Sequence, residues 1–245
     1  MNAQATATTK PTWQPSAITR HLALLEAHAP ISKRVLQAGQ HLYHAVDTFD
    51  RLFIVGTGMC KTTEVSRDGR EQVVAVHFKG DWIGLGGIAA GRYGCDAIAM
   101  DTCEIWSVPY DALLASCART PALLEVLHLA MSRELLRERA TMLALCTLPA
   151  DARVAEFLRW WASELDERGM RTDCLRLPMS RAEIGNFLGM TLESVSRAFS
   201  RLARSELIRF TDRSRRDIEI PALAALGDFS RRCIADRDGA EVALH

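Results

Sequence analysis

Ser180-Arg-Ala-Glu-Ile-Gly-Asn-Phe-Leu-Gly-Met-Thr-Leu-Glu-Ser-Val-Ser-Arg197 is the stretch of this 245-residue sequence that decides its fold. Ser180 and Glu183 form a capping box, in which the hydroxyl and the carboxylate satisfy free backbone amides at a helix start. Gly189 stands where the chain must turn sharply, and Thr191 is placed to cap a second helix. The stretch therefore predicts a helix-turn-helix.

The second helix, expected over about residues 192–204, has one apolar face and one polar face. Val195, Phe199 and Leu202 recur at helical spacing and can face a core. A recognition helix presents its N-terminal residues to base edges in the major groove, where Arg can fork onto guanine and Glu can accept from cytosine. We therefore predict that the base-reading side chains are Glu193, Ser196 and Arg197.

A basic hairpin is expected after this helix. Residues 207–211 and 217–220 read as two short strands that flank Asp212-Arg-Ser-Arg-Arg216, which is typical of the wing of a winged helix. Arginines at such a tip meet phosphate and add affinity without sequence information. An isolated helix-turn-helix pattern could be an ordinary pair of packed helices, but cap, turn and wing together favour DNA binding. The predicted phosphate contacts are Arg181, Thr191, Ser194, Arg213, Arg215 and Arg216.

Composition fits a folded, soluble protein rather than an exported or membrane protein. The net charge is zero, yet residues 171–233 carry 12 Lys+Arg against 8 Asp+Glu, so the positive surplus coincides with the predicted DNA-binding part. The seven cysteines are scattered singly and odd in number, which argues against a disulfide framework and favours a reducing cytoplasm. No stretch is apolar for long enough to cross a bilayer, so no membrane partner is expected.

The N-terminal half alternates short apolar runs with glycine-containing turns from Val35 to Pro109. Residues 59–65 and 71–78 read as two strands joined at Arg67-Asp-Gly-Arg70, whose Asp-Gly pair suits a tight hairpin turn. Many short strands at this spacing predict a β-barrel or sandwich.

From Pro121 the apolar period becomes helical, and nothing breaks it before Pro149. A helix of about 27 residues spans about 40 Å, more than a small barrel needs to cover itself. We expect a parallel dimer seam, with packing on its own domain as the alternative. A second helix is expected from Asp151, which would cap it, to near Gly169. The predicted dimer-interface residues are Leu124, Leu127, Met131, Leu135, Glu138, Met142 and Leu145.

Three motifs resemble a known superfamily, that of the cyclic AMP receptor protein and the fumarate-nitrate reductase regulator, closest to the latter branch. They are Gly80-Asp-Trp-Ile-Gly84, Leu177-Pro-Met-Ser-Arg-Ala-Glu-Ile-Gly-Asn-Phe-Leu-Gly189 and Thr191-Leu-Glu-Ser-Val-Ser-Arg197. The resemblance implies an α+β fold with a cyclic-nucleotide-binding-like β-roll, a long dimerisation helix and a C-terminal winged helix-turn-helix. The expected divisions are a flexible tail (1–20), the β-roll (21–118), the dimerisation helix (119–148), the DNA-binding domain (149–235) and a second tail (236–245).

Departures from the family pattern limit the possible effectors. The arginine-serine pair that holds the phosphate in cyclic AMP binders is absent from Arg92-Tyr-Gly-Cys-Asp96, so cyclic AMP is not expected. Oxygen-sensing relatives hold an iron–sulfur cluster with N-terminal cysteines, but residues 1–59 contain none, and Trp106 stands where the β-roll ligand would fall. No other cofactor is predicted, although haem stays an alternative. The candidate haem ligands are His21, His28, His41, His44, His77 and His128.

The resemblance also implies the function. We expect a homodimer that binds double-stranded DNA at a TTGAT-N4-ATCAA palindrome and acts with RNA polymerase, as an activator rather than a repressor. By resemblance Glu138 matches an acidic position that weakens the dimer of the oxygen sensor; an exposed glutamate is the alternative. Two further alternatives are a cyclic-nucleotide- or haem-responsive regulator and a metal-dependent enzyme of the cupin type. The enzyme is disfavoured because His77 and the His41/His44 pair lack a matching carboxylate pattern, and no catalytic or metal site is expected.

Overall fold

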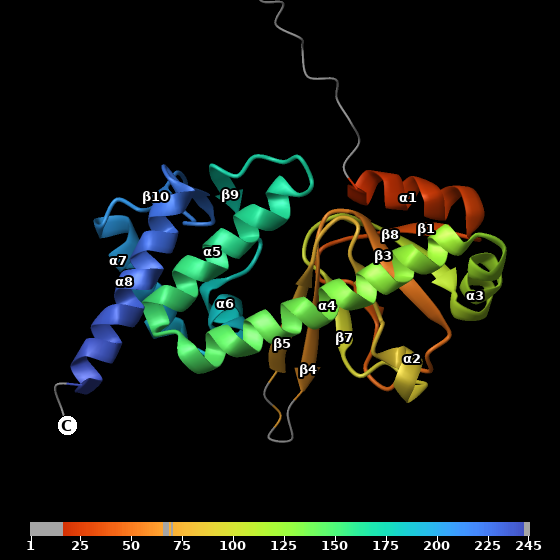
Figure 1. The fold of residues 1–245 in the computed structure, drawn as a ribbon, viewed down its shortest axis with the longest axis horizontal. Helices are drawn as coiled ribbons and strands as arrows, with labels where there is room; N and C mark the ends of the chain where they lie inside the picture. Colours follow the sequence, from red (N-terminus) through yellow and green to blue (C-terminus); the bar gives the residue numbers. More distant parts are fainter. Residues whose placement is uncertain (1–16, 66–68, 70, 243–245) are drawn as a thin grey trace, which may run out of the picture.

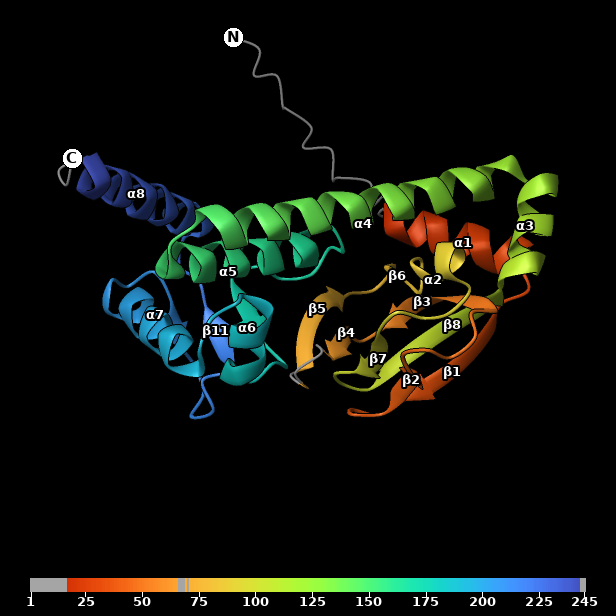
Figure 2. The ribbon, with the colours of Figure 1, turned by 90° about the horizontal axis from the view of Figure 1, so that it is seen from below.

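The structure is a computed structural model that describes residues 17–65, 69 and 71–242, with side chains described as far as residue 235. Helices and strands form an N-terminal β-roll and a C-terminal helical unit, and one long helix runs along both (Figures 1 and 2). Most of the predicted N-terminal tail and most of the turn at 67–70 lie outside the described residues. No helix among the described residues is long and apolar enough to cross a membrane.

The β-roll consists of two four-stranded sheets, in the orders β1-β8-β3-β6 and β2-β7-β4-β5. The predicted hairpin is present, since β4 and β5 pair antiparallel from Cys60↔His77 to Val65↔Glu71. Its strands are β1 (Ser32–Leu36), β2 (His41–Tyr43), β3 (Arg51–Thr57), β4 (Cys60–Val65), β5 (Glu71–His77), β6 (Trp82–Ile83), β7 (Asp96–Ala99) and β8 (Cys103–Pro109). Its helices are α1 (Ala17–His28), α2 (Gly87–Ala90) and α3 (Tyr110–Arg119).

Helix α4 (Pro121–Thr147) is the 27-residue helix that the sequence predicts. Proline is favoured at a helix start because its missing amide would be unpaired there in any case. The N-terminal part of α4 packs against α1 and α3 in the core of the β-roll, through Leu123, Val126 and Leu127. Farther along, α4 leaves the roll and passes beside α5 (Figure 2).

The C-terminal unit packs helices around a small antiparallel sheet in the order β10-β11-β9. Strands β10 and β11 form the predicted wing, and β9, which the sequence did not reveal, extends it through Ile218↔Leu175. The elements are α5 (Ala150–Asp166), β9 (Cys174–Arg176), α6 (Arg181–Phe187), α7 (Leu192–Arg204), β10 (Arg209–Phe210), β11 (Asp217–Glu219) and α8 (Leu223–Val242).

The two units share apolar packing. Val73, Val76 and Phe78 of the β-roll belong to the same buried cluster as Trp161 and Leu158 of α5. Aromatic rings dominate this contact, with Phe78 and Trp161 centroids 4.9 Å apart in an edge-on arrangement. Such a pair contributes about 0.5–1.5 kcal/mol beyond its buried area. The β-roll and the C-terminal unit are therefore in direct contact, in addition to being joined through α4.

Three local expectations differ from the structure. Helix α1 begins at Ala17, inside the segment expected to be a tail, and α8 continues to Val242, beyond the expected end of the DNA-binding domain. Asp151 does not cap α5, which begins one residue earlier with Pro149 at its N-cap. The Asp151 carboxylate instead pairs with Arg201 of α7, because a charged partner from another helix is within reach.

Candidate nucleic-acid interface

The turn between α6 and α7 has the chemistry that the sequence predicts. The Ser180 hydroxyl accepts from the Glu183 amide at 3.2 Å, and the Glu183 carboxylate accepts from the Ser180 amide at 2.8 Å. Gly189 has φ +60°, the left-handed conformation that glycine adopts without steric cost. Gly185 was not anticipated: a Cβ there would lie 2.7 Å from the Met190 carbonyl oxygen. Helix α6 and the turn before α7 therefore approach so closely that a side chain at position 185 would force the backbone to shift.

Helix α7 presents the three predicted base-reading side chains to solvent. The Thr191 hydroxyl caps the helix by accepting from the Ser194 amide at 3.2 Å. Val195, Phe199 and Leu202 are buried as predicted. Glu193, Ser196 and Arg197 are exposed on the other face, and Glu193 pairs with Arg197 one turn later. The pair holds a hydrogen-bond acceptor and a forked donor side by side near the start of the helix, which suits contacts to base edges.

The wing is fixed by its own backbone and by one aspartate. Asp212 accepts from the amides of Ser214 and Asp217, each at 3.0 Å. Arg215 has φ +58°, so the chain turns tightly at the tip. The backbone carbonyl of Arg215 faces Arg181 of α6. The three arginines predicted to meet phosphate are all exposed on this tip: Arg213, Arg215 and Arg216.

Arg181 connects α6, α7 and the wing. Its guanidinium lies 3.5 Å from the centroid of the Phe199 ring and donates to the Arg215 carbonyl oxygen at 2.8 Å. Burial, together with the positive charges of Arg215 and Arg216, lowers the pKa of Arg181 to about 10. A nearby anion would relieve this concentration of positive charge. A cavity of about 290 Å³ opens here, lined by Arg181, Ser196, Phe199, Phe210, Arg215 and Arg216 among others.

The structure brings four of the nine predicted DNA-contacting residues to one hollow. Ser196 of α7, Arg181 of α6, and Arg215 and Arg216 of the wing line the same hollow, although they come from three separate elements. Thr191 and Ser194 are hydrogen-bonded to each other through their hydroxyls at 3.0 Å, at the start of α7. The contacts of the Arg181 guanidinium with the Phe199 and Phe210 rings were not predicted, because β10 brings Phe210 to α6 only in the folded chain.

The helix-turn-helix is attached to the β-roll by polar contacts. The Val73 amide of β5 donates to the Asn186 side-chain oxygen at 2.6 Å, and Lys61 of β4 donates to Glu183 at 2.7 Å. Burial favours a higher pKa for Glu183, but the hydrogen bonds from Lys61 and Ser180 hold this pKa below its usual range. The β4–β5 hairpin therefore contacts the first helix of the DNA-reading motif directly.

A buried ion network joins the β-roll, α4 and the segment that follows α5. Arg168 donates to Asp81 at 2.9 Å and to Glu164 at 2.7 Å. Arg137 of α4 bridges the same two carboxylates at 2.8 and 2.7 Å. Beside this network, burial raises the pKa of Glu134 to about 7, against the influence of Arg137. Asp81 belongs to the Gly80–Gly84 motif, which therefore has a structural role at the domain contact.

Six of the seven side chains predicted for the dimer interface are at least partly accessible. Among these six residues, Leu135 and Met142 are 55% and 63% exposed, and Glu138 is exposed as well. Leu127 is the exception: it is 4% exposed and packs in the core of its own β-roll. The sequence could not distinguish the accessible leucines of α4 from the buried Leu127, because α4 carries apolar residues on more than one face. Further exposed apolar residues on α4 are Leu129, Leu136 and Leu143.

Residues 92–96, where the sequence lacks the arginine-serine pair of cyclic AMP binders, contribute a tyrosine to an aromatic cluster. Tyr93 is 3% exposed, stacks on Tyr43 with ring centroids 3.9 Å apart, and donates to the Arg51 carbonyl oxygen at 2.8 Å. A tyrosine fixed in this way supplies no positive charge for a phosphate. Arg92 next to it is exposed. Tyr93 and Tyr43 therefore fill this stretch with aromatic packing.

The cysteines do not fit an iron–sulfur cluster. Cys60 and Cys103 lie with their sulfur atoms 3.6 Å apart in the core of the roll. Among the residues that the structure describes, no group of three cysteines comes together, whereas the cluster needs four thiolates.

The expectation that the histidines lack a matching carboxylate is wrong for His41 and His44. Within the described ranges His77 is buried, and burial lowers its pKa to about 4. The His41/His44 pair, by contrast, does have a matching carboxylate, because Asp96 of β7 lies beside both rings. The two strands that carry them are far apart in the sequence, so the juxtaposition was not visible there.

Comparisons with known proteins agree with both halves of the fold. Residues 33–120 match the cyclic nucleotide-binding domain family, and residues 152–229 match the Crp-like helix-turn-helix domain family. The chain is 34% identical over 193 residues to the transcriptional activator protein FnrA of Stutzerimonas stutzeri, covering 79% of each chain. It is 35% identical over 175 residues to the transcriptional activator protein Anr of Pseudomonas protegens, covering 71% of this chain and 72% of Anr.

A solved structure shows the same arrangement. FixK2 from Bradyrhizobium japonicum superimposes with a TM-score of 0.70 at 28% identity, over 81% of this chain and 96% of FixK2. Two domain families in the same order, relatives above 30% identity over most of their length and a shared fold lead to one conclusion. The chain belongs to the CRP/FNR family of transcription regulators.

Proposed function

We propose that this protein is a homodimeric transcription activator that binds a TTGAT-N4-ATCAA palindrome through α7. The observation that carries the proposal is the exposed Glu193, Ser196 and Arg197 face at the N-terminal end of α7, beside a cationic hollow. The assignment as an activator, with RNA polymerase as partner, rests on the names of the FnrA and Anr relatives. The cytoplasm is the compartment that this function requires.

Phosphate and base contacts have separate roles in this proposal. Arg181 and the wing arginines bind the DNA backbone and set the position of the protein, whereas the α7 face distinguishes sequences. Thr191 and Ser194 at the start of α7 are placed to add phosphate contacts, because helix N-termini favour anions.

Accessible apolar residues of α4 support the proposed dimer. The proposed seam consists of the exposed Leu124, Met131, Leu135 and Met142 and the half-buried Leu145, together with the exposed Glu138; Leu127 is excluded by its burial. A two-fold dimer places two α7 helices one helical turn of DNA apart, which matches the two half-sites of a palindrome.

The β-roll is proposed to receive a signal and transmit it to α6. The contacts that support this route are the Asn186 and Lys61 hydrogen bonds between the β4–β5 hairpin and the helix-turn-helix. Cyclic AMP is a poor candidate for the signal, since Tyr93 supplies no charge for its phosphate. A regulatory rather than enzymatic role is favoured because both matched families belong to a regulator fold.

The proposal is tested by fluorescence anisotropy on a labelled TTGAT-N4-ATCAA duplex, with a scrambled duplex of equal composition as control. Specific binding exceeds non-specific binding by about 10³-fold or more in proteins of this kind. Equal affinity for both duplexes would contradict the assignment of Glu193, Ser196 and Arg197. Leu135→Glu is expected to yield monomers in sedimentation and to lose binding to the palindrome, whereas Leu124→Glu at the end of the seam should do less.

A further inference from the structure

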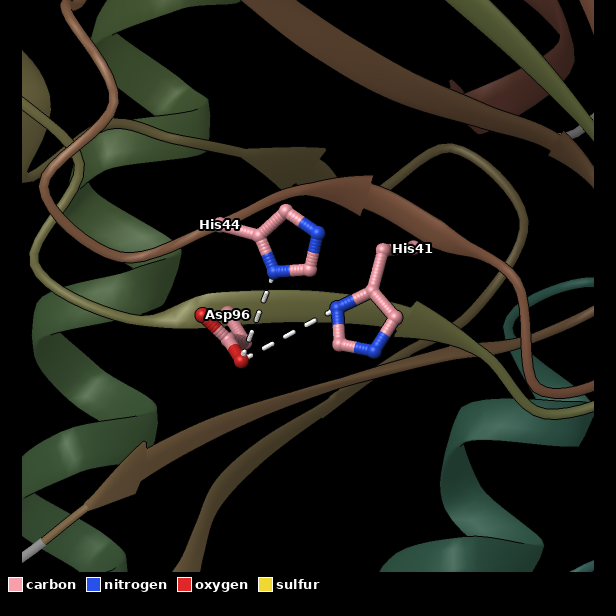
Figure 3. A group of neighbouring side chains, drawn as sticks. All are labelled: His41, His44 and Asp96. Carbon is pink, nitrogen blue, oxygen red and sulfur yellow. Dashed lines mark ion pairs between the residues drawn. The ribbon is translucent and has the colours of Figure 1, made fainter.

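Two histidines and one aspartate lie together on the outside of the β-roll. Figure 3 shows the imidazoles of His41 and His44 turned toward the Asp96 carboxylate, which reaches them from the neighbouring strand. The ligand-forming atoms of the three side chains all lie within 4.8 Å of one another. Both histidine side chains are accessible, at 35% and 61% exposed.

An irregularity in strand pairing brings the two histidines to the same face. In a regular strand, residues three apart project to opposite faces. The pairing of β2 with β7 shifts register between His41 and Tyr43, which inserts an extra residue at this point. His41 and His44 are therefore both outside, whereas Leu42 and Tyr43 between them are buried.

The Asp96 carboxylate is oriented so that one oxygen faces both rings. Its Oδ1 accepts from the Ala45 amide at 2.6 Å, which fixes the side chain. Its Oδ2 lies 3.8 Å from Nδ1 of His41 and 3.8 Å from Nδ1 of His44. These separations are too long for hydrogen bonds. Among the described residues, no donor is hydrogen-bonded to this oxygen, so the carboxylate and the two imidazole nitrogens converge as long ion pairs without hydrogen bonds between them.

Two imidazoles and one carboxylate are the donor set of a borderline divalent metal ion. Zn²⁺ binds histidine nitrogen and aspartate oxygen at about 2.0–2.2 Å, which places tetrahedral ligands about 3.3 Å apart. Each Nδ1–Oδ2 separation needs to shorten by only about 0.5 Å to reach that value. The rings are stacked with centroids 4.2 Å apart, so both must turn from this arrangement to direct their nitrogens at one ion.

We propose that His41, His44 and Asp96 bind one divalent transition-metal ion of the zinc class, with water completing its coordination. Mg²⁺ and Ca²⁺ do not suit the site, because they require mainly oxygen ligands. The site joins the end of β2 to β7, so a bound ion would stabilise the β-roll by linking two strands. The site is independent of the DNA-binding surface, so a failure of the DNA-binding assignment would leave it unaffected.

The experiment is a Zn²⁺ titration of untagged protein by competition with a chromophoric chelator, followed by Co²⁺ absorption spectroscopy. We expect one high-affinity ion per chain and a Co²⁺ spectrum without a sulfur-to-cobalt charge-transfer band. His41→Gln, His44→Gln and Asp96→Asn are each expected to weaken Zn²⁺ binding by at least about tenfold, because loss of even an outer-shell partner costs about 10–100-fold. His28→Gln, an exposed histidine outside the cluster, is the matched control and should bind as the wild type does.

The two histidine variants keep the test valid if Asp96→Asn disturbs the fold, because neither ring takes part in the Ala45 hydrogen bond. Thermal melts should show a rise in Tm on adding Zn²⁺ to the wild type and to His28→Gln, but not to His41→Gln or His44→Gln. Absence of binding, equal binding by wild type and cluster variants, or a thiolate band in the Co²⁺ spectrum would each overturn the proposal.

Discussion

Arg168→Met is expected to destabilise the fold strongly, because it removes one cation from a buried network. The Arg168 side chain is 1% exposed, and the two carboxylates it contacts, Asp81 and Glu164, are 5% and 8% exposed. After the substitution only Arg137 would compensate both carboxylates. Breaking a buried ion pair by removing one partner costs about 3–5 kcal/mol. Methionine keeps most of the side-chain volume, so the loss measures the charge and its hydrogen bonds, including the one to the Lys79 carbonyl oxygen, rather than packing.

Urea unfolding followed by tryptophan fluorescence measures this effect, since Trp160 donates to Glu164 inside the same network. With an m-value of about 3 kcal/mol/M, the midpoint should fall by about 1–1.7 M. Arg171→Met is the matched control: its pair with Asp173 is exposed and screened by solvent, so the midpoint should hardly move. If both variants shift the midpoint equally, the network does not hold the domains together as we infer.

Three further predictions concern the DNA-reading motif and pH. Gly185→Ala forces a Cβ against the Met190 carbonyl oxygen and should cost about 1–3 kcal/mol in urea unfolding; an unchanged midpoint would contradict the close contact. Arg181→Ala should weaken binding to specific and scrambled duplexes alike and reduce the salt slope by about 1, and a loss confined to the specific duplex would make Arg181 a base reader instead. For Glu134 the folded pKa of about 7 exceeds the ordinary value of 4.5, so stability should fall as pH rises between these values. Glu134→Gln should flatten that slope in urea midpoints measured from pH 5 to 7.5, and an unchanged slope would contradict the assignment.

Local signals predicted the DNA-reading motif accurately. The Ser180–Glu183 capping box and the Thr191 cap depend on residues three positions apart, so they are legible without tertiary structure. The amphipathic pattern of α7 likewise identified its buried side, because Val195 and Phe199 face the core for the reason the period suggests. The bounds, the cap and the buried side of α7 were therefore readable from the sequence.

Features that depend on distant parts of the chain were not predictable. Asp96 meets His41 only because β2 pairs with β7 and shifts register there. Leu127 shares the apolar period of α4 with Leu135, but only the position of the β-roll decides which one is buried. Asp151 has the chemistry of a helix cap, and the approach of Arg201 gives it another role.

The central claim, that α7 reads bases through Arg197, is tested most directly by a protein–DNA double-mutant cycle. Wild type and Arg197→Ala are titrated against the TTGAT-N4-ATCAA duplex and against one with the G·C pair of each half-site replaced by A·T. If Arg197 forks onto that guanine, the variant loses about 1–3 kcal/mol per contact on the first duplex and almost nothing on the second. An equal loss on both duplexes would mean that Arg197 binds the backbone, and the base-reading assignment would be wrong.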